Sequence, residues 1–259
     1  MTVIEITGVV GFRDTGGIAA SGGTIRDGVL FRSGNLAAVD DRGAAEIRAR
    51  VGRIVDLRSD GEVEQGATAV TGIPITRLPL YLGSPTSFFL EDFSLGEIYA
   101  HLLADSSAEL VAAVRVIAQG VPTLVHCTAG KDRTGLTVAV ALSAVGADRE
   151  AVVADYALTG ELIPAADRRA TSERLARTYP HSRHAAMLAT ESPASVMRAT
   201  LDAVDRIWGG AAGYLGAHGF GPDELAALRM VLVAPSPPSE PGPEPDPEPA
   251  SALAQGASS

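Results

Sequence analysis

The sequence predicts an α/β domain with a mostly parallel central sheet of about four strands, flanked by helices and extended by further helices towards the C-terminus. Three observations support this prediction. Short apolar runs alternate with helical segments through the first half of the 259-residue chain, the second half reads as almost wholly helical, and a strand–loop–helix pattern surrounds the single cysteine. A hydrophobic content of 46% supplies enough apolar material for a sizeable core.

Four short apolar runs suit strands that are buried on both faces. They span residues 29–32, 53–57, 73–80 and 121–126. Helical segments are expected between them, at residues 40–50 and 106–119. The second of these is the better marked, because Ser106 and Glu109 have the spacing of a capping box and Gly120 follows as a stop. Strands that alternate with helices indicate parallel pairing.

Residues 136–145 are apolar on nearly every side, which predicts a central helix buried between layers. Further helices are expected at 148–158, 165–178, 193–207 and 222–232. We expect residues 1–233 to form one domain. Residues 234–259 contain eight prolines between Pro235 and Pro249 together with acidic residues, a composition that predicts a disordered tail.

Composition excludes several classes of protein. One cysteine excludes an internal disulfide and a zinc site built on paired cysteines. A formal net charge of −10 argues against a nucleic-acid-binding protein. Residues 1–11 lack the pattern of a secretory signal, and the longest apolar stretch, residues 136–147, is too short to span a bilayer. We expect a protein that is cytoplasmic, or exported without a recognisable signal peptide, and not stably inserted in a membrane.

The strand–loop–helix segment carries the chemistry. Cys127 and Arg133 stand six positions apart, after a predicted strand and before a predicted helix. At that place in an α/β protein, free N–H groups and the positive end of the helix face a bound anion. Arg133 adds a planar fork that matches phosphate, and Gly130 permits a positive φ on the bend. The predicted phosphate-binding residues are His126, Cys127, Thr128, Ala129, Gly130, Lys131, Asp132 and Arg133.

The same positive field favours the thiolate form of Cys127. The thiolate is expected to attack phosphorus and form a phosphocysteine, which water then hydrolyses. Thr134 stands where its hydroxyl could donate a hydrogen bond to the sulfur and assist its departure. His126 is expected to brace the loop by hydrogen bonds rather than to transfer protons. No metal or organic cofactor is needed.

The leaving group needs a proton, so a general acid is required. Asp132 lies within the loop and is favoured, although the neighbouring cations Lys131 and Arg133 should keep it ionised. Asp56, at the end of a predicted strand, is the second candidate. A structural ion pair of Asp56 with Arg133 or Arg58 is an equally good interpretation.

Other readings of the loop fit less well. The segment does not match a nucleotide-binding loop, because position 125, where the first glycine of that motif should stand, is Val. Asp132 also stands where Ser or Thr should bind Mg²⁺. A sulfurtransferase has a similar loop, but the long loop with a terminal Arg133 fits phosphate better. A buried structural cysteine with Arg133 in a salt bridge is disfavoured because the motif stands in the strand–loop–helix context that phosphate binding requires. A non-catalytic module that binds phosphoproteins through the same loop remains the alternative from another class. Lys131 is the only lysine among 21 basic residues, and its position inside the loop suggests contact with an additional phosphate.

The run HCTAGKDRTG at residues 126–135 resembles the loop of bacterial protein-tyrosine phosphatases related to mycobacterial protein tyrosine phosphatase B. Further similar segments lie at residues 12–17, 30–34, 56–59, 155–156 and 214–229, so that the resemblance covers nearly all of residues 8–232. It implies the cysteine-phosphatase fold and hydrolysis of phosphotyrosine, with phosphoserine, phosphothreonine and phosphoinositides as further substrates. The implied partners are thus a phosphoprotein or a phosphoinositide, and the oligomeric state is not indicated. Thr128 replaces an aromatic residue of close relatives, which should alter ring stacking at the pocket mouth.

Residues 167–184 hold five arginines and two histidines against two acidic residues. A solvated helical face explains such a charge run, and a flap that attracts anions to the site explains it equally well. Helical flaps occur in the family that the sequence resembles, and this favours the flap.

Overall fold

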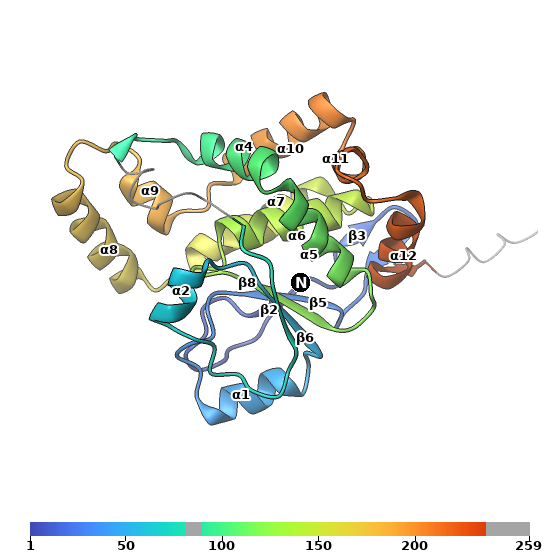
Figure 1. Cartoon of the computed structure of the whole chain (residues 1–259), viewed down its shortest axis with the longest axis horizontal. Coiled ribbons are helices and arrows are strands. Elements are labelled where there is room, and N and C mark those ends of the chain that lie inside the picture. Colours follow the sequence, from blue (N-terminus) through green and yellow to red (C-terminus); the bar gives the residue numbers. More distant parts are fainter. Residues whose placement is uncertain (81–89, 237–259) are drawn as a thin grey trace, which may run out of the picture.

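The computed structural model describes residues 1–80 and 90–236 (Figure 1). Its main sheet has six strands in the order β1-β2-β5-β8-β6-β7. The four predicted strands form the parallel part of this sheet, as β5 (Leu30–Ser33), β8 (Thr123–His126), β6 (Arg53–Asp56) and β7 (Ile75–Arg77). The predicted α/β class and its mostly parallel core are confirmed.

The sheet is mixed and larger than predicted. Strands β1 (Thr2–Val3) and β2 (Arg13–Asp14) pair antiparallel at one edge. A second, three-stranded antiparallel sheet joins β3 (Ala19–Ala20), β4 (Gly23–Ile25) and β9 (Val233–Pro235). Strands of two or three residues are too short to show a periodic pattern, so the sequence could not reveal them.

Strand β9 crosses the predicted start of the tail. Ala234 and Pro235 pair with Thr24 and Gly23 of β4, so the ordered chain continues past residue 233. The pairing partner is some 200 residues away, which local composition cannot anticipate. Residues 237–259, the remainder of the predicted tail, lie outside the described residues.

The helices cover both faces of the main sheet (Figure 1). Helix α1 (Asp41–Arg48) covers one face, above a cluster that includes Phe31, Ile54 and Leu124. The other face packs against a larger cluster that includes Val55 and Val125. These residues follow Ile54 and Leu124 in their strands and therefore point to the opposite face of the sheet. The remaining described helices are α2 (Asp60–Gln65), α4 (Leu95–Asp105), α5 (Ser107–Ile117), α6 (Asp132–Ala144), α7 (Arg149–Leu162), α8 (Ala165–Thr178), α9 (Ala185–Thr190), α10 (Ala194–Trp208), α11 (Ala211–Ala217) and α12 (Pro222–Leu232).

The predicted helices form, with differences at their ends. Helix α6 begins at Asp132, ahead of the apolar segment 136–145 on which it was predicted, so the end of the loop is already its first turn. The capping box predicted at Ser106 and Glu109 does not form. Ser106 ends α4, its N–H donating to Leu102 O, and its φ of −115° with ψ of 25° is not the extended conformation of a capping residue. Helices α2, α4, α9 and α11 were not predicted, although Ser94 and Glu97 form a capping box at the start of α4.

The central strands bring the chemistry to one edge of the sheet. Ser33, His126 and Asp56 are in register at the carboxyl ends of β5, β8 and β6. Cys127 and the loop follow directly, and α6 runs back through the core with ten buried residues. Among the described residues, no helix is both long and apolar enough to cross a membrane.

Candidate active site

The loop between β8 and α6 is shaped by contact with the adjacent strand. Cys127, 2% exposed, lies at the carboxyl end of β8. Gly130 has a φ of +69°, as the sequence predicted, and a Cβ on it would lie 2.4 Å from the carbonyl carbon of Ser33. Only glycine allows both this conformation and this approach.

Two carbonyl groups of the loop are held by residues of strand β5 and the segment that follows it. Thr128 O accepts from the N–H of Asn35 at 3.0 Å, and Gly130 O accepts from Arg32 Nη2 at 2.9 Å. In a trans peptide the following N–H points the opposite way, which here is into the loop. The N–H groups of residues 128–133 have no hydrogen-bond acceptor among the described residues. Free donors at the start of a helix are a site for an anion.

Arg133 is oriented by Glu62, a residue to which the sequence analysis gave no role. Its Nη1 and Nη2 donate to Glu62 Oε2 and Oε1 at 2.7 and 2.6 Å, and Nη1 also donates to Leu57 O at 3.3 Å. Nε and the remaining hydrogen of Nη2 form no hydrogen bond with the described residues. This free edge is a fork for two phosphate oxygens.

Glu62 is fixed from both sides. It closes a capping box with Ser59 at the start of α2, and Thr128 Oγ1 donates to its Oε1 at 2.5 Å. Burial acts to raise its pKa, but the hydrogen bonds and charge of Arg133 outweigh this and lower the pKa to about 2. The Ser-x-x-Glu spacing after a strand was the available signal in the sequence. Thr128 thus contacts Glu62 at the edge of the loop.

A buried cluster supports the loop from behind. Asp155 accepts from Arg13 Nε at 2.8 Å and from Arg32 Nη1 at 2.5 Å, and Thr159 Oγ1 accepts from Arg13 Nη2 at 2.7 Å. Burial acts to raise the pKa of Asp155, but the charges of Arg32 and Arg13 lower it overall. Arg32 also binds Gly130 O, so this cluster fixes the direction of a loop carbonyl. Arg13, Arg32 and Asp155 lie in segments that carry the resemblance, where the sequence gave them no role.

His126 and Asp56 lie under the loop. His126 Nδ1 is 3.2 Å from Cys127 O, and burial lowers the pKa of His126. Asp56 is 2% exposed and is held by Arg58, whose Nε and Nη2 donate at 2.9 and 2.7 Å. His126 Nε2 is 3.7 Å from Asp56. Of the interpretations left open for Asp56, this arrangement matches the structural ion pair with Arg58.

Lys131 does not face the phosphate site. It is fully buried, and its Nζ donates to Asp132 Oδ1 at 2.8 Å and to Glu191 O at 2.9 Å. The predicted contact with an additional phosphate does not fit this position, because both partners lie within the protein and the ammonium group has no exposed surface. Lys131 instead ties the loop to the connection between α9 and α10.

Asp132 occupies the first turn of α6, with its side chain 18% exposed. Its Oδ1 accepts from Tyr99 Oη at 2.8 Å as well as from Lys131. Thr134 is buried, and its hydroxyl has no hydrogen-bond partner among the described residues, so the predicted contact with the sulfur is not made. Ala129 lies in the loop as predicted and contributes its backbone.

The basic segment 167–184 forms α8 and the turn after it, at the periphery of the molecule (Figure 1). Only Leu175 of α8 is buried, and Arg169, Arg174 and Arg177 are exposed. The arginine face is therefore solvated. After this segment the chain returns to the loop at Glu191, whose backbone carbonyl accepts a hydrogen bond from Lys131 Nζ.

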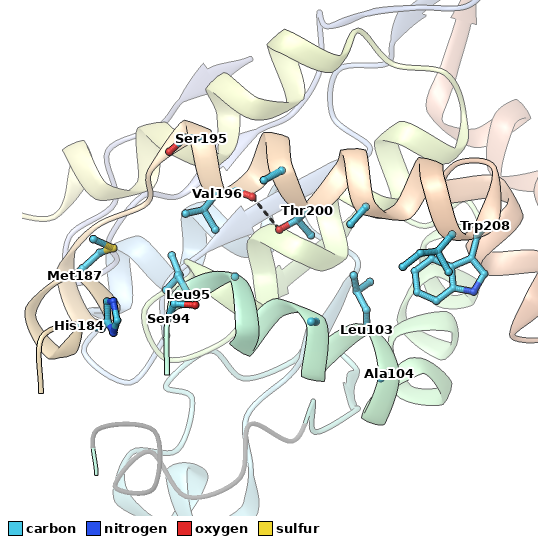
Figure 2. Close-up of a pocket in the computed structure, with 15 residues that line it drawn as sticks. Ser94, Leu95, Leu103, Ala104, His184, Met187, Ser195, Val196, Thr200 and Trp208 are labelled. Carbon is cyan, nitrogen blue, oxygen red and sulfur yellow. Dashed lines mark hydrogen bonds between the residues drawn. The ribbon is translucent and has the colours of Figure 1, made fainter. Parts of the chain in front are cut away.

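A separate cavity of about 670 Å³ lies between α4 and α10 and contains none of the loop residues (Figure 2). Its lining is mostly apolar, with Trp208 at one end and Met187 and His184 at the other. Its lining contains neither the cysteine nor any arginine or lysine, so it offers no counterpart to the anion-binding loop.

Comparison with known proteins assigns the chain to a family. Residues 4–234 match the model of the Tyrosine phosphatase family. The triple specificity protein phosphatase PtpB of Mycobacterium tuberculosis is 35% identical over 201 residues, which are 63% of this chain and 71% of that protein. A Cupriavidus necator protein that carries a tyrosine-protein phosphatase name is 28% identical over 78% of this chain and 79% of its own length.

Among solved structures, Pseudomonas aeruginosa TpbA aligns over 63% of this chain and 86% of its own with 21% identity. Its TM-score of 0.30 is too low to carry an argument about the fold. Together, the loop geometry and the family match place the chain among the cysteine-dependent phosphatases. The chain belongs to the Tyrosine phosphatase family and is a tyrosine phosphatase.

Proposed function

We propose that the protein hydrolyses phosphomonoesters through a phosphocysteine formed on Cys127. The proposal is carried by the N–H groups of residues 128–133 and the Nε–Nη2 edge of Arg133, which surround Cys127 and have no acceptor in the part of the chain that the structure describes. These donors bind the three phosphoryl oxygens that do not leave. Negative charge builds up on these phosphoryl oxygens in the transition state, and the donors are already oriented to stabilise it.

The first step forms the S–P bond as the bond from phosphorus to the ester oxygen breaks. Asp132 supplies the proton to the departing oxygen. In the second step a water gives a proton to the Asp132 carboxylate and attacks phosphorus, and the sulfur leaves as a thiolate. Inorganic phosphate is released and both groups return to their starting forms. Asp56 takes no part in proton transfer, since Arg58 holds both of its oxygens.

Phosphotyrosine in proteins is the main proposed substrate. The name of the M. tuberculosis relative supports a broader range, and we include phosphoserine, phosphothreonine and phosphoinositides in the proposal. Because Lys131 is buried, any preference for multiply phosphorylated lipids has to come from groups outside the loop.

Turnover of a phosphotyrosine peptide in EDTA, by the wild-type protein and by Cys127→Ser, tests the proposal. We expect turnover without a metal in the wild type and none in the variant, while vanadate binding by the variant is retained because Arg133 and the N–H groups remain. Activity of Cys127→Ser near that of the wild type contradicts the nucleophile. Binding without turnover in the wild type indicates a non-catalytic phosphoprotein-binding module.

A further inference from the structure

Tyr99 reaches the loop from helix α4, far from it in sequence. Its side chain is fully buried, and its hydroxyl donates to Asp132 Oδ1 at 2.8 Å. The same hydroxyl lies 2.6 Å from that of Tyr156 on α7, and the two rings meet edge to face with centroids 6.1 Å apart. Packing alone does not require this hydroxyl, since a phenylalanine ring fills the same space.

Counting hydrogens fixes the direction of these bonds. Tyr99 has one hydroxyl hydrogen, which it gives to Asp132, so Tyr156 must be the donor in the contact between the two tyrosines. Burial raises the pKa of Tyr99, and the charge of Asp132 raises it further. Burial also raises the pKa of Tyr156. Both hydroxyl groups therefore keep their hydrogens at neutral pH.

The two oxygens of Asp132 are not equivalent. Oδ1 accepts from Tyr99 and from the buried Nζ of Lys131, which fills both of its lone pairs. Oδ2 forms no hydrogen bond with the described residues, and the side chain is 18% exposed. A proton on the neutral carboxyl group can therefore be carried only by Oδ2.

We propose that Tyr99 is a positioning residue for the leaving-group proton. Its hydroxyl, together with Lys131, reserves Oδ1 of Asp132 as an acceptor, so that Oδ2 is the oxygen that donates and recovers the proton. This inference rests on the proposed role of Asp132. As the S–P bond forms and the P–O bond breaks, the proton moves from Oδ2 to the ester oxygen. The negative charge left on the carboxylate strengthens both hydrogen bonds at Oδ1. In the second step, Oδ2 takes a proton from the attacking water.

The test compares a poor leaving group with a good one, because a general acid matters most when the departing oxygen is basic. Phenyl phosphate has the poor leaving group and para-nitrophenyl phosphate the good one. We expect Tyr99→Phe to lower kcat/KM, which reports the step that releases the leaving group, about tenfold on phenyl phosphate, the size of one lost hydrogen bond to a charged group, and much less on para-nitrophenyl phosphate.

Tyr214→Phe is the matched control. Tyr214 is also fully buried, and its hydroxyl donates to Leu103 O at 2.9 Å, away from the loop. Removal of the Tyr214 hydroxyl should leave the ratio of the rates on phenyl phosphate and para-nitrophenyl phosphate at the wild-type value. A Tyr99→Phe variant that loses the same factor on both substrates has lost only structural support, and the proposal is then wrong.

Two further variants complete the test. Lys131→Met removes the other donor to Oδ1, and it must show the same selective loss on phenyl phosphate even if Tyr99→Phe does not fold. An unchanged ratio in soluble Lys131→Met overturns the inference. If Asp132→Asn keeps the wild-type ratio while Cys127→Ser loses all turnover, Asp132 is not the acid. The inference about Tyr99 then fails, and the phosphocysteine mechanism stands.

Discussion

Glu62 and Arg133 meet end-on, with two hydrogen bonds of 2.7 and 2.6 Å between the carboxylate and the guanidinium group. The pairing uses the Nη1–Nη2 edge of Arg133 and leaves the Nε–Nη2 edge for phosphate. The same carboxylate caps helix α2 through Ser59. The orientation of Arg133, the arginine proposed to bind phosphate, is therefore coupled to the position of helix α2, which follows the neighbouring strand β6.

Replacing Arg133 by lysine should lower kcat/KM for a phosphotyrosine peptide by about 100-fold or more, because an ammonium group cannot pair with Glu62 and bind two phosphate oxygens at once. Steady-state kinetics measure the effect. Arg198→Lys is the control, since Arg198 pairs with Glu150 on the surface and should leave the rate unchanged. A loss of less than about fivefold in Arg133→Lys contradicts the proposed fork, since one hydrogen bond to a charged group alone is worth more.

Glu62→Gln should flatten the dependence of stability on pH in acid. The pKa of Glu62 is about 2 in the folded protein, below its ordinary value of 4.5. Its ionised form therefore stabilises the fold fully above pH 4.5, and this contribution is lost as the pH falls towards 2. Urea unfolding near pH 6 and pH 3 gives the two free energies of unfolding. Wild type should lose more stability between them than the variant, and parallel losses would show that the pair with Arg133 does not hold in solution.

Lys131→Met should reduce turnover of phosphotyrosine peptides with one phosphate and with two neighbouring phosphates by the same factor. The reason is that Lys131 contacts Asp132 and Glu191 O and has no exposed surface. Kinetics on paired peptides of equal length measure the ratio. A larger loss on the doubly phosphorylated peptide would restore the contact with a second phosphate that the sequence suggested.

Asp155→Asn should destabilise the protein by about 3–5 kcal/mol, because it leaves Arg13 and Arg32 buried without their common counter-charge. It should also lower kcat/KM, since Arg32 holds Gly130 O. Denaturant unfolding gives the first quantity and kinetics the second. Glu150→Gln, which breaks an exposed pair, serves as the control and should change neither. A stable Asp155→Asn enzyme with full activity contradicts the supporting role of this cluster.

Peroxide should inactivate the enzyme by oxidising Cys127, and bound phosphate should slow the loss by covering the sulfur. No second cysteine exists to form a disulfide with the sulfenic acid, so recovery needs an external thiol or attack by a backbone nitrogen. Mass spectrometry should find added oxygen on Cys127 before the exposed Met230 in samples that have lost activity. Inactivation with Cys127 unmodified rules out an essential thiol.

Local patterns in the sequence were sufficient for much of the architecture. The four parallel strands and the helices at 193–207 and 222–232 follow from apolar residues and from the prolines and glycines that bound them, because periodicity reports which face of an element is buried. The loop was predicted by the spacing of Cys127 and Arg133 and by Gly130, whose positive φ the structure has. Those features depend on residues close together in the chain.

The partners of the loop residues were decided only by the tertiary structure. Glu62 and Tyr99 lie 71 and 33 positions from Arg133 and Asp132, the loop residues that they contact. Asp155 lies 123 positions from Arg32, which in turn holds the loop carbonyl Gly130 O. For Lys131, charge alone suggested a phosphate contact, and packing buried it against Asp132 and Glu191 instead.

The sequence by itself determined the class of fold and was sufficient to propose Cys127 as the nucleophile, because a strand, a tight loop and a helix are local structures. Whether a carboxylate is available for proton transfer, as proposed for Asp132, or forms an ion pair that supports the structure depends on distances between elements that are remote in the chain. Those distances are set by the packing of α2, α4 and α7 around the sheet, where burial removes water and leaves each charged group only the partners that the fold brings within reach.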